Sequence, residues 1–296
     1  MAIHEFANDH RSGSTELALR ACRILEKFAP HAADSLQQVR GLNHLAQALA
    51  EAQPSMAAVL SVCNRCLAAS EKGEPPKTAA KRVARELRQM QAIVAHRAAA
   101  LIPSGATVLT YSYSSSVLAA LLESWKSGCR FRVLCSEGRP QLEGRVLAEG
   151  LAQKRIPVEL FTDAALFSVL ATADLVLLGC DAILARWLVN KVGTAALLCL
   201  ARQARIPSYA VAASFKFLPR ELEKRFQIRP QPPREVWRIR NRNIAVRNLY
   251  FEKALLRNCT GIITEDGVHS PAAIRGLLQK STLAAGFRSI GKRGDE

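Results

Sequence analysis

The feature that most constrains the fold is an alternation, between residues 106 and 264, of short apolar runs with longer segments of helical periodicity. The expected strands are 106–111, 130–135, 158–161, 175–179, 208–213 and 261–264, and the expected helices are 117–125, 142–153, 164–170 and 195–202. Strands that alternate with helices form βαβ units, which place helices on both faces of a parallel sheet. We therefore expect an α/β fold whose C-terminal part is a Rossmann-like, doubly wound parallel sheet.

The first part of the chain follows a different pattern. Residues 32–101 are rich in Ala, Leu, Gln and Arg, contain no strand-like run, and are interrupted at Pro54 and at 72–76. This pattern predicts three or four helices packed as a bundle, with a loop at 71–78. The expected organisation is an N-terminal helical domain over 1–102 and the Rossmann-like domain over 103–296.

The run 175–179 is typical of a strand buried on both faces, and Asp181 follows its carboxyl end. Ligands bind at that end of the strands in an open parallel sheet. Asn190, Lys191 and Gly193 come next and supply an amide, a cation and a flexible backbone before a helical segment. This order indicates a site for a phosphorylated ligand with an acid/base group beside it. The alternative is a turn-capping aspartate and a surface lysine.

Polar residues follow other expected strands as well. They are the hydroxyl run Ser112, Ser114, Ser115 and Ser116 after 106–111, Arg139 after 130–135, and Lys216 after 208–213. Because strand ends of one sheet share an edge, we expect these residues to meet Asp181 and Lys191 in one anion-binding pocket. The hydroxyl run fits a polar helix cap equally well. No Gly-x-Gly-x-x-Gly follows the first strand, so no dinucleotide cofactor is expected.

A second candidate for anion binding lies near the start of the chain. Arg11, Ser12, Gly13 and Ser14 precede an apolar stripe of helical period. Backbone amides and the dipole at a helix start can hold a phosphate. An ordinary side-chain cap by Ser12 or Ser14 explains the same residues.

The chain is strongly basic, with a formal net charge of +16. Between Lys216 and Arg257 there are twelve Lys and Arg against four Glu. Such a surface attracts phosphorylated metabolites, nucleic acid or an acidic protein partner, and a solvated cationic surface is the alternative. No zinc-finger or RNA-recognition motif accompanies it.

The eight cysteines lie mostly in apolar segments, as buried thiols of intracellular proteins do. Cys63 and Cys66 form the one close pair, without a second pair or histidines at ligand spacing, so no metal site is expected. No apolar run reaches the roughly 18 residues of a membrane span, and no signal-peptide pattern opens the chain. We expect a cytoplasmic protein.

Six segments together resemble a known family. They are 110–114 (Thr-Tyr-Ser-Tyr-Ser), 136–140 (Ser-Glu-Gly-Arg-Pro) with Gly144, 179–182 (Gly-Cys-Asp-Ala), 190–194 (Asn-Lys-Val-Gly-Thr), 214–217 (Ser-Phe-Lys-Phe) and 263–268 (Ile-Thr-Glu-Asp-Gly-Val). This order is similar to the family that joins the regulatory alpha, beta and delta subunits of translation initiation factor 2B, ribose-1,5-bisphosphate isomerase and methylthioribose-1-phosphate isomerase. The likeness spans about 105–275, and more weakly the segment 11–14.

The resemblance implies a helical N-terminal domain, a Rossmann-like C-terminal domain and a homodimer formed through the latter. In the isomerase branches it implies a catalytic cysteine after the first strand and a catalytic aspartate after the fourth. Asp181 matches the aspartate, whereas the cysteine position falls on Ser112. A thiol, with a pKa near about 8.5, exchanges protons at neutral pH far more readily than a serine hydroxyl.

Two hypotheses follow. The first is a protein that binds a phosphorylated sugar or nucleotide without the cysteine-dependent chemistry of the family. The second is an aldose–ketose isomerase for a phosphorylated pentose, in which Asp181 moves the proton and Ser112 only orients the substrate. Retention of Asp181 favours the isomerase, and loss of the thiol favours binding alone. A direct role in translation is a third option.

Overall fold

The computed structural model describes residues 2–9, 12–28, 35–279 and 283–288. The chain divides into two compact units that are not continuous in sequence. The first unit comprises residues 1–89, 215–227 and 275–296, and the second comprises 90–214 and 228–274. In the described residues, no helix is both long enough and apolar enough to cross a membrane.

The first unit is helical. Its elements are α1 (Ala2–Ala7), α2 (Ser14–Glu26), α3 (Ser35–Ala52), α4 (Ala57–Ser70), the first part of α5 (Pro76–Ala99), α10 (Arg220–Glu223), most of α11 (Ile274–Leu278) and α12 (Ala285–Arg288). α4 packs against α2 and α3 and is buried on nearly all sides. Leu17, Leu49 and Leu60 are fully buried in this unit. The expected helical bundle is confirmed, with three helices over 35–99.

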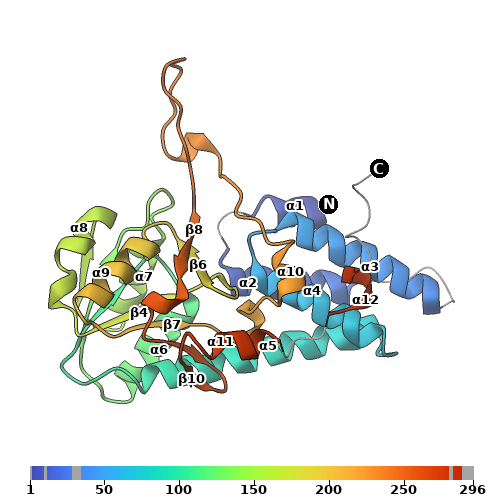
Figure 1. Ribbon diagram of the computed structural model, residues 1–296, viewed down its shortest axis with the longest axis horizontal. Helices are drawn as coiled ribbons and strands as arrows, with labels where there is room; N and C mark the ends of the chain where they lie inside the picture. Colours follow the sequence, from blue (N-terminus) through green and yellow to red (C-terminus); the bar gives the residue numbers. More distant parts are fainter. Residues whose placement is uncertain (1, 10–11, 29–34, 280–282, 289–296) are drawn as a thin grey trace. The chain divides into compact units, whose positions relative to one another are not determined.

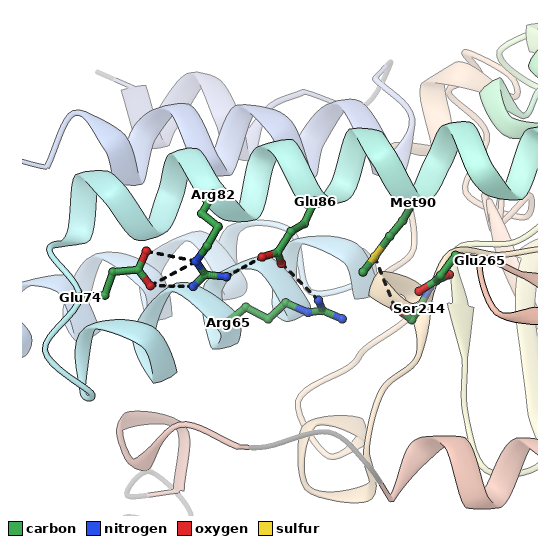
Figure 2. Close-up of polar contacts among 7 residues, drawn as sticks. All are labelled: Arg65, Glu74, Arg82, Glu86, Met90, Ser214 and Glu265. Carbon is green, nitrogen blue, oxygen red and sulfur yellow. Dashed lines mark hydrogen bonds and ion pairs between the residues drawn. The ribbon is translucent and has the colours of Figure 1, made fainter.

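A chain of ion pairs connects α4, the following loop and α5 (Figure 2). Arg82 contacts Glu74 at 2.7 Å and Glu86 at 2.6 Å, and Glu86 also lies 3.8 Å from Arg65. Arg82 donates hydrogen bonds to Glu74 and lowers the pKa of that carboxyl group. Because these side chains are partly exposed, the ion pairs add only modestly to the packing of α5, whose Ala80 and Val83 are fully buried.

The second unit is built on a seven-stranded sheet with the order β10-β9-β7-β4-β1-β2-β3. The strands are β1 (Thr107–Thr110), β2 (Arg132–Ser136), β3 (Val158–Phe161), β4 (Leu175–Gly179), β7 (Ser208–Val211), β9 (Gly261–Thr264) and β10 (Gly267–His269). Neighbours are parallel except β10, which pairs antiparallel with β9. Strand order reverses between β1 and β4, which pair directly. The doubly wound sheet is confirmed, with an antiparallel strand added at one edge.

Helices cover the sheet because its central strands are apolar on both faces. They are α6 (Ser115–Lys126), α7 (Glu143–Ala152), α8 (Asp163–Ser168) and α9 (Thr194–Gln203), accompanied by the 3₁₀ turns η1 (Leu170–Thr172), η2 (Ser214–Lys216) and η4 (Leu256–Asn258). Every residue of β1, β4 and β9 is buried. Val108, Leu177 and Ile263 join one continuous core with the helices. Burial on this scale is what holds the strand ends in place.

A second, three-stranded antiparallel sheet was not expected from the sequence. It contains β5 (Ala182–Ile183), β6 (Trp187–Lys191) and β8 (Phe251–Leu255), in the order β5-β6-β8. Asn190 and Lys191 therefore lie in β6, and the expectation that they follow a strand of the parallel sheet is wrong. The apolar part of β6 is short, and its partner β8 lies far away in the sequence, so local periodicity does not reveal the pairing.

Residues 229–250, here called the arm, extend away from the start of β8 (Figure 1). Two hydrogen bonds close the base of the arm: the Gln231 N–H donates to the Asn248 carbonyl at 2.9 Å, and Asn248 Nδ2 donates to the Pro232 carbonyl at 3.0 Å. The 3₁₀ turn η3 (Pro233–Glu235) lies just beyond this base. Trp237 and Leu249 are more than half exposed.

Candidate functional site

Ser112 and Asp181 lie just beyond the carboxyl ends of β1 and β4, where the strand order of the sheet reverses. Such a switch point is the usual ligand site of a doubly wound sheet. Ser112 is buried and adopts a φ of 62°, and its N–H donates to Ser136 Oγ at 3.4 Å. Asp181 is half-buried, and its N–H donates to the Val189 carbonyl at 2.8 Å. The topology thus brings both residues to one edge.

The hydroxyl run after β1 has mixed roles. Ser114 caps α6, since its Oγ accepts a hydrogen bond from the Val117 N–H at 3.4 Å. Ser116 is buried and donates to Gln91 Oε1 at 2.6 Å, whereas Ser115 is exposed. A Cβ on Gly179 would lie 2.5 Å from the Cβ of Ser114, so the turn packs directly on the end of β4.

Lys191 is the buried cation of this edge. Its side chain is 6% exposed, and its Nζ lies 2.5 Å from Glu143 Oε1 and 4.8 Å from the centroid of the Tyr250 ring. The second oxygen of Glu143, Oε2, is also buried, and no hydrogen-bond partner for it exists among the described residues. An ammonium group carries three N–H donors, of which Glu143 uses one. A donor and an acceptor with remaining capacity therefore lie side by side.

Asn190 organises the chain that leads into α9. Its Nδ2 donates to Thr194 Oγ1 at 3.0 Å, and Thr194 Oγ1 donates to the Lys191 carbonyl at 2.6 Å. Asn190 is thus a buried structural group in this structure. Gly193 follows with a φ of 107°, and a Cβ there would lie 2.4 Å from the Tyr111 hydroxyl oxygen. That hydroxyl donates to the Val192 carbonyl at 2.9 Å, and burial raises its pKa.

Internal carboxylates occupy two groups of backbone donors near the strand ends, one of which, at Gly193, the sequence suggested for phosphate. Glu252 Oε1 accepts from the N–H groups of Gly193 at 2.8 Å and Ala195 at 2.7 Å, at the start of α9. Asp163 accepts from the N–H groups of Gly138 at 2.9 Å and Arg139 at 2.7 Å. A negative charge already neutralises each of these positive backbone sites. These two groups of backbone N–H donors are therefore already occupied by carboxylates of the chain.

Side chains of the β2–α7 loop meet the base of the arm. Gln141 Nε2 donates to the Tyr250 hydroxyl at 2.6 Å, and that hydroxyl donates to Glu235 Oε2 at 2.6 Å. Burial, followed by the hydrogen bond to Glu235, raises the pKa of Tyr250. The exposed Arg139 guanidinium reaches the Val236 carbonyl at 3.5 Å. The arm is therefore attached to the loop that carries Arg139 and to the ring beside Lys191.

We call Ser112, Arg139, Glu143, Asp181 and Lys191 the strand-end site. Glu143, Gln141, Tyr250 and Glu252 have no role in the sequence analysis. Tyr250 is the last residue of the arm and Glu252 lies in β8, and no motif of the sequence analysis includes either of them.

The remaining expected site residues belong to the first unit. Lys216 is buried in η2, and Ser14 is buried as the first residue of α2. The N-cap of α2 is Gly13, so the expected cap by a serine side chain is wrong, and the Ser12 N–H instead donates to Asp9 Oδ1 at 2.9 Å. Arg11 lies outside the described residues. That these residues reach the strand-end site stays a prediction.

Within the described ranges, no three His, Cys, Asp or Glu side chains gather at ligand distance. All eight cysteines lie in those ranges, and none forms a disulfide. Burial raises the pKa of Cys135 to about 12, so this thiol of β2 is protonated at neutral pH.

The fold defines a two-unit α/β protein with a Rossmann-like, parallel-dominated sheet. The chain belongs to the initiation factor 2 subunit family, IF-2B, whose family model matches residues 10–271. The resemblance derived from the six sequence segments is thereby confirmed.

Similar proteins carry two kinds of name. A "putative translation initiation factor eIF-2B subunit 2-like" protein of Pyrococcus furiosus is 28% identical over 91% of this chain and 95% of its own length. A ribose 1,5-bisphosphate isomerase of Archaeoglobus fulgidus is 28% identical over 88% of this chain and 85% of its own length. The crystal structure of a Pyrococcus horikoshii translation initiation factor eIF-2B superimposes with a TM-score of 0.79 at 25% identity, covering 91% of this chain and 96% of that chain.

Proposed function

We propose that this chain binds a phosphorylated sugar or nucleotide at the strand-end site, without the cysteine-dependent chemistry of its family. The observation that carries the proposal is the Lys191–Glu143 pair. Lys191 keeps N–H donors for a phosphate oxygen, and Glu143 Oε2 is a buried acceptor with no partner among the described residues. A ligand that carries both a phosphate and a hydroxyl group satisfies the two side chains together.

The proposal that this chain does not catalyse the isomerisation depends on Ser112. Its hydroxyl stands where the resemblance implies a thiol, at the end of β1 next to β4. A serine hydroxyl is too weak an acid to exchange protons at neutral pH unless a base is positioned on it. The buried position and left-handed backbone of Ser112 suit a group that orients a bound ligand.

An aldose–ketose isomerase acting on a phosphorylated pentose is the second candidate, and Asp181 favours it. This carboxylate follows β4 at the switch point, where the family's catalytic aspartate is implied. In this alternative Asp181 moves a proton between the first two carbons of the open-chain sugar. The A. fulgidus relative bears the name of such an enzyme.

Thermal unfolding with a panel of phosphates tests the binding proposal. The panel is ribose-1,5-bisphosphate, methylthioribose-1-phosphate, fructose-6-phosphate, AMP and GMP. A ligand that binds only the folded state raises the midpoint by an amount set by its concentration relative to its Kd. We expect at least one ligand to raise the midpoint and to remain unchanged by NMR over hours. Ketose formation that Asp181→Asn abolishes would establish the isomerase instead, and no shift with any phosphate would refute the site.

The assembly and location belong to the same proposal. We infer a homodimer formed through the second unit, as the resemblance implies, and an acidic macromolecular partner for the arm. The arm carries Arg229, Arg234, Arg238, Arg240, Arg242 and Arg247. The cysteines without disulfides suit a reducing compartment, and we place the protein in the cytoplasm.

A further inference from the structure

The second unit contains a hollow at the edge of the sheet opposite the strand-end site. Its volume is about 310 Å³, and it lies where α9 ends and where β7 and β9 begin. Ile206 and Pro207 line it from the α9–β7 connection, and Asn258 lines it from the η4–β9 connection. A hollow of this volume falls at the lower end of the range of small-molecule sites.

Three arginines line this hollow: Arg202, Arg205 and Arg257. We call it the arginine pocket. No acidic residue lines it. Arg202 Nη1 donates to Asn258 Oδ1 at 3.1 Å, and none of the three guanidinium groups pairs with a carboxylate of the described chain. Planar guanidinium groups bind phosphate oxygens through paired, charge-assisted hydrogen bonds.

One local effect opposes an anion here, because the carboxyl end of α9 carries a partial negative charge. That charge amounts to about half an elementary charge and is confined to the last turn. The terminal carbonyls are also already paired: the Leu200, Ala201 and Arg202 carbonyls accept from the N–H groups of 204, 206 and 205, at 2.9, 2.9 and 3.1 Å. Three full positive charges therefore outweigh the helix end.

The conformation of Arg205 offers an internal comparison. Arg205 ends α9 with a φ of 59°, and Arg155 ends α7 in the same way with a φ of 61°. Both residues precede an Ile-Pro pair, and in both the isoleucine N–H closes the helix end. Arg155 and its neighbour Lys154 are exposed and do not line the arginine pocket. This second helix end therefore provides a control with equal charge outside the arginine pocket.

We propose that the arginine pocket is a second anion site, which binds the phosphate group of a small phosphate monoester. The guanidinium groups of Arg202, Arg205 and Arg257 hold the phosphate oxygens, and Ile206 and Pro207 contact the organic part of the ligand. The site is independent of the strand-end site, because it lies at the amino ends of the strands instead of their carboxyl ends.

Isothermal titration calorimetry with inorganic phosphate and with ribose 5-phosphate tests this site. The variant is Arg202→Ala with Arg257→Ala, and the control is Lys154→Ala with Arg155→Ala. Each pair removes two positive charges from exposed positions, so thermal unfolding without phosphate shows whether both proteins fold alike. We expect the variant to weaken one class of phosphate site by about tenfold or more, and the control to change it by less than about twofold.

Three results would overturn the proposal. An equal loss in the control would assign binding to the net charge of the surface. An unchanged phosphate affinity in the Arg202 and Arg257 variant would show that phosphate binds outside the arginine pocket. Binding of a short single-stranded RNA, without binding of inorganic phosphate or ribose 5-phosphate, would identify a polymer surface instead of a pocket. A loss confined to the Arg202 and Arg257 variant would establish the site even if the strand-end site binds nothing.

Discussion

Lys191 Nζ lies 2.5 Å from Glu143 Oε1, although 48 positions separate the two residues in the sequence. The pair joins β6 of the antiparallel sheet to the first residue of α7, so it connects the two sheets of the second unit. The Lys191 side chain is almost fully buried, whereas that of Glu143 is 29% exposed. Because the lysine is the more buried of the two, removal of the Glu143 carboxylate would leave a buried positive charge without its partner.

The first prediction concerns this pair. Glu143→Gln leaves the buried ammonium of Lys191 opposite a neutral amide, and we expect a loss of about 1–2 kcal/mol of stability in urea unfolding. Inorganic phosphate should raise the midpoint of this variant more than that of the parent, because it replaces the missing negative charge. Glu149→Gln, an exposed change on the same helix, is the control. Equal phosphate effects in all three proteins would show that Lys191 does not bind the anion.

The second prediction concerns the missing thiol. Ser112→Cys places a thiol, a group with a reference pKa of about 8.5, at the end of β1, which pairs with the strand that precedes Asp181. We expect this variant to convert ribose-1,5-bisphosphate to its ketose isomer, followed by NMR, while the parent leaves it unchanged. Ser115→Cys places a thiol on the exposed face of the same turn and should stay inactive. Ketose formation by the parent protein would contradict the binding-only proposal.

The third prediction separates strain from contact at two glycines. Gly193 and Gly105 both have a left-handed backbone, with φ values of 107° and 84°. A Cβ on Gly193 would lie 2.4 Å from the Tyr111 hydroxyl oxygen, whereas a Cβ on Gly105 meets nothing within 4 Å. We expect Gly105→Ala to cost about 1 kcal/mol and Gly193→Ala about 3 kcal/mol in urea unfolding. Equal losses of stability in the two variants would show that the backbone at Gly193 moves away from Tyr111 at little cost.

The fourth prediction concerns alkaline pH. The pKa of Tyr250 is raised by burial first, and then by its bond to Glu235. A folded-state pKa above the unfolded value gives stability that is complete below about pH 10 and is lost as the pH rises further. Tyr250→Phe should therefore show a smaller loss of stability between about pH 9 and 11 than the parent.

Tyr111 also has a raised pKa, so the change at Tyr250 is expected to remove only part of the alkaline loss. Tyr113→Phe, at an exposed side chain, serves as the matched control. Urea unfolding at each pH gives the comparison. An identical pH dependence in Tyr250→Phe and the parent would mean that the phenol is not held neutral by the fold.

Much of the parallel sheet follows from local sequence. The strands 158–161, 175–179 and 261–264 match the expected bounds, because each is a short run of mostly apolar residues closed by polar or turn residues. The same signal placed Asp181 at a strand end. Periodicity specifies which residues are buried in an element, and the order of strand ends in a doubly wound sheet then follows from chirality and topology.

The groups that complete the strand-end site are not visible in this way. Glu252 caps α9 across 59 residues, and Tyr250 stacks near Lys191 because β8 pairs with β6. These contacts depend on a non-local strand pairing with a short apolar signal. The sequence therefore indicates which side chains lie at the carboxyl-end edge of the sheet. It does not indicate which of them already form ion pairs or hydrogen bonds within the chain.

Because hydrogen bonds close the base of the arm, the geometry around Lys191 does not depend on how long the arm is. Gln231 and Asn248 bond across the base, and β8 resumes its register with β6 at Phe251. Residues 237–247, which lie beyond the contacts of Glu235 and Val236, can be lost, gained or exchanged without moving Lys191 along its strand. A change of length or sequence beyond the base therefore alters the surface that the arm presents, while the pairing of β6 with β8 that holds the lysine stays the same.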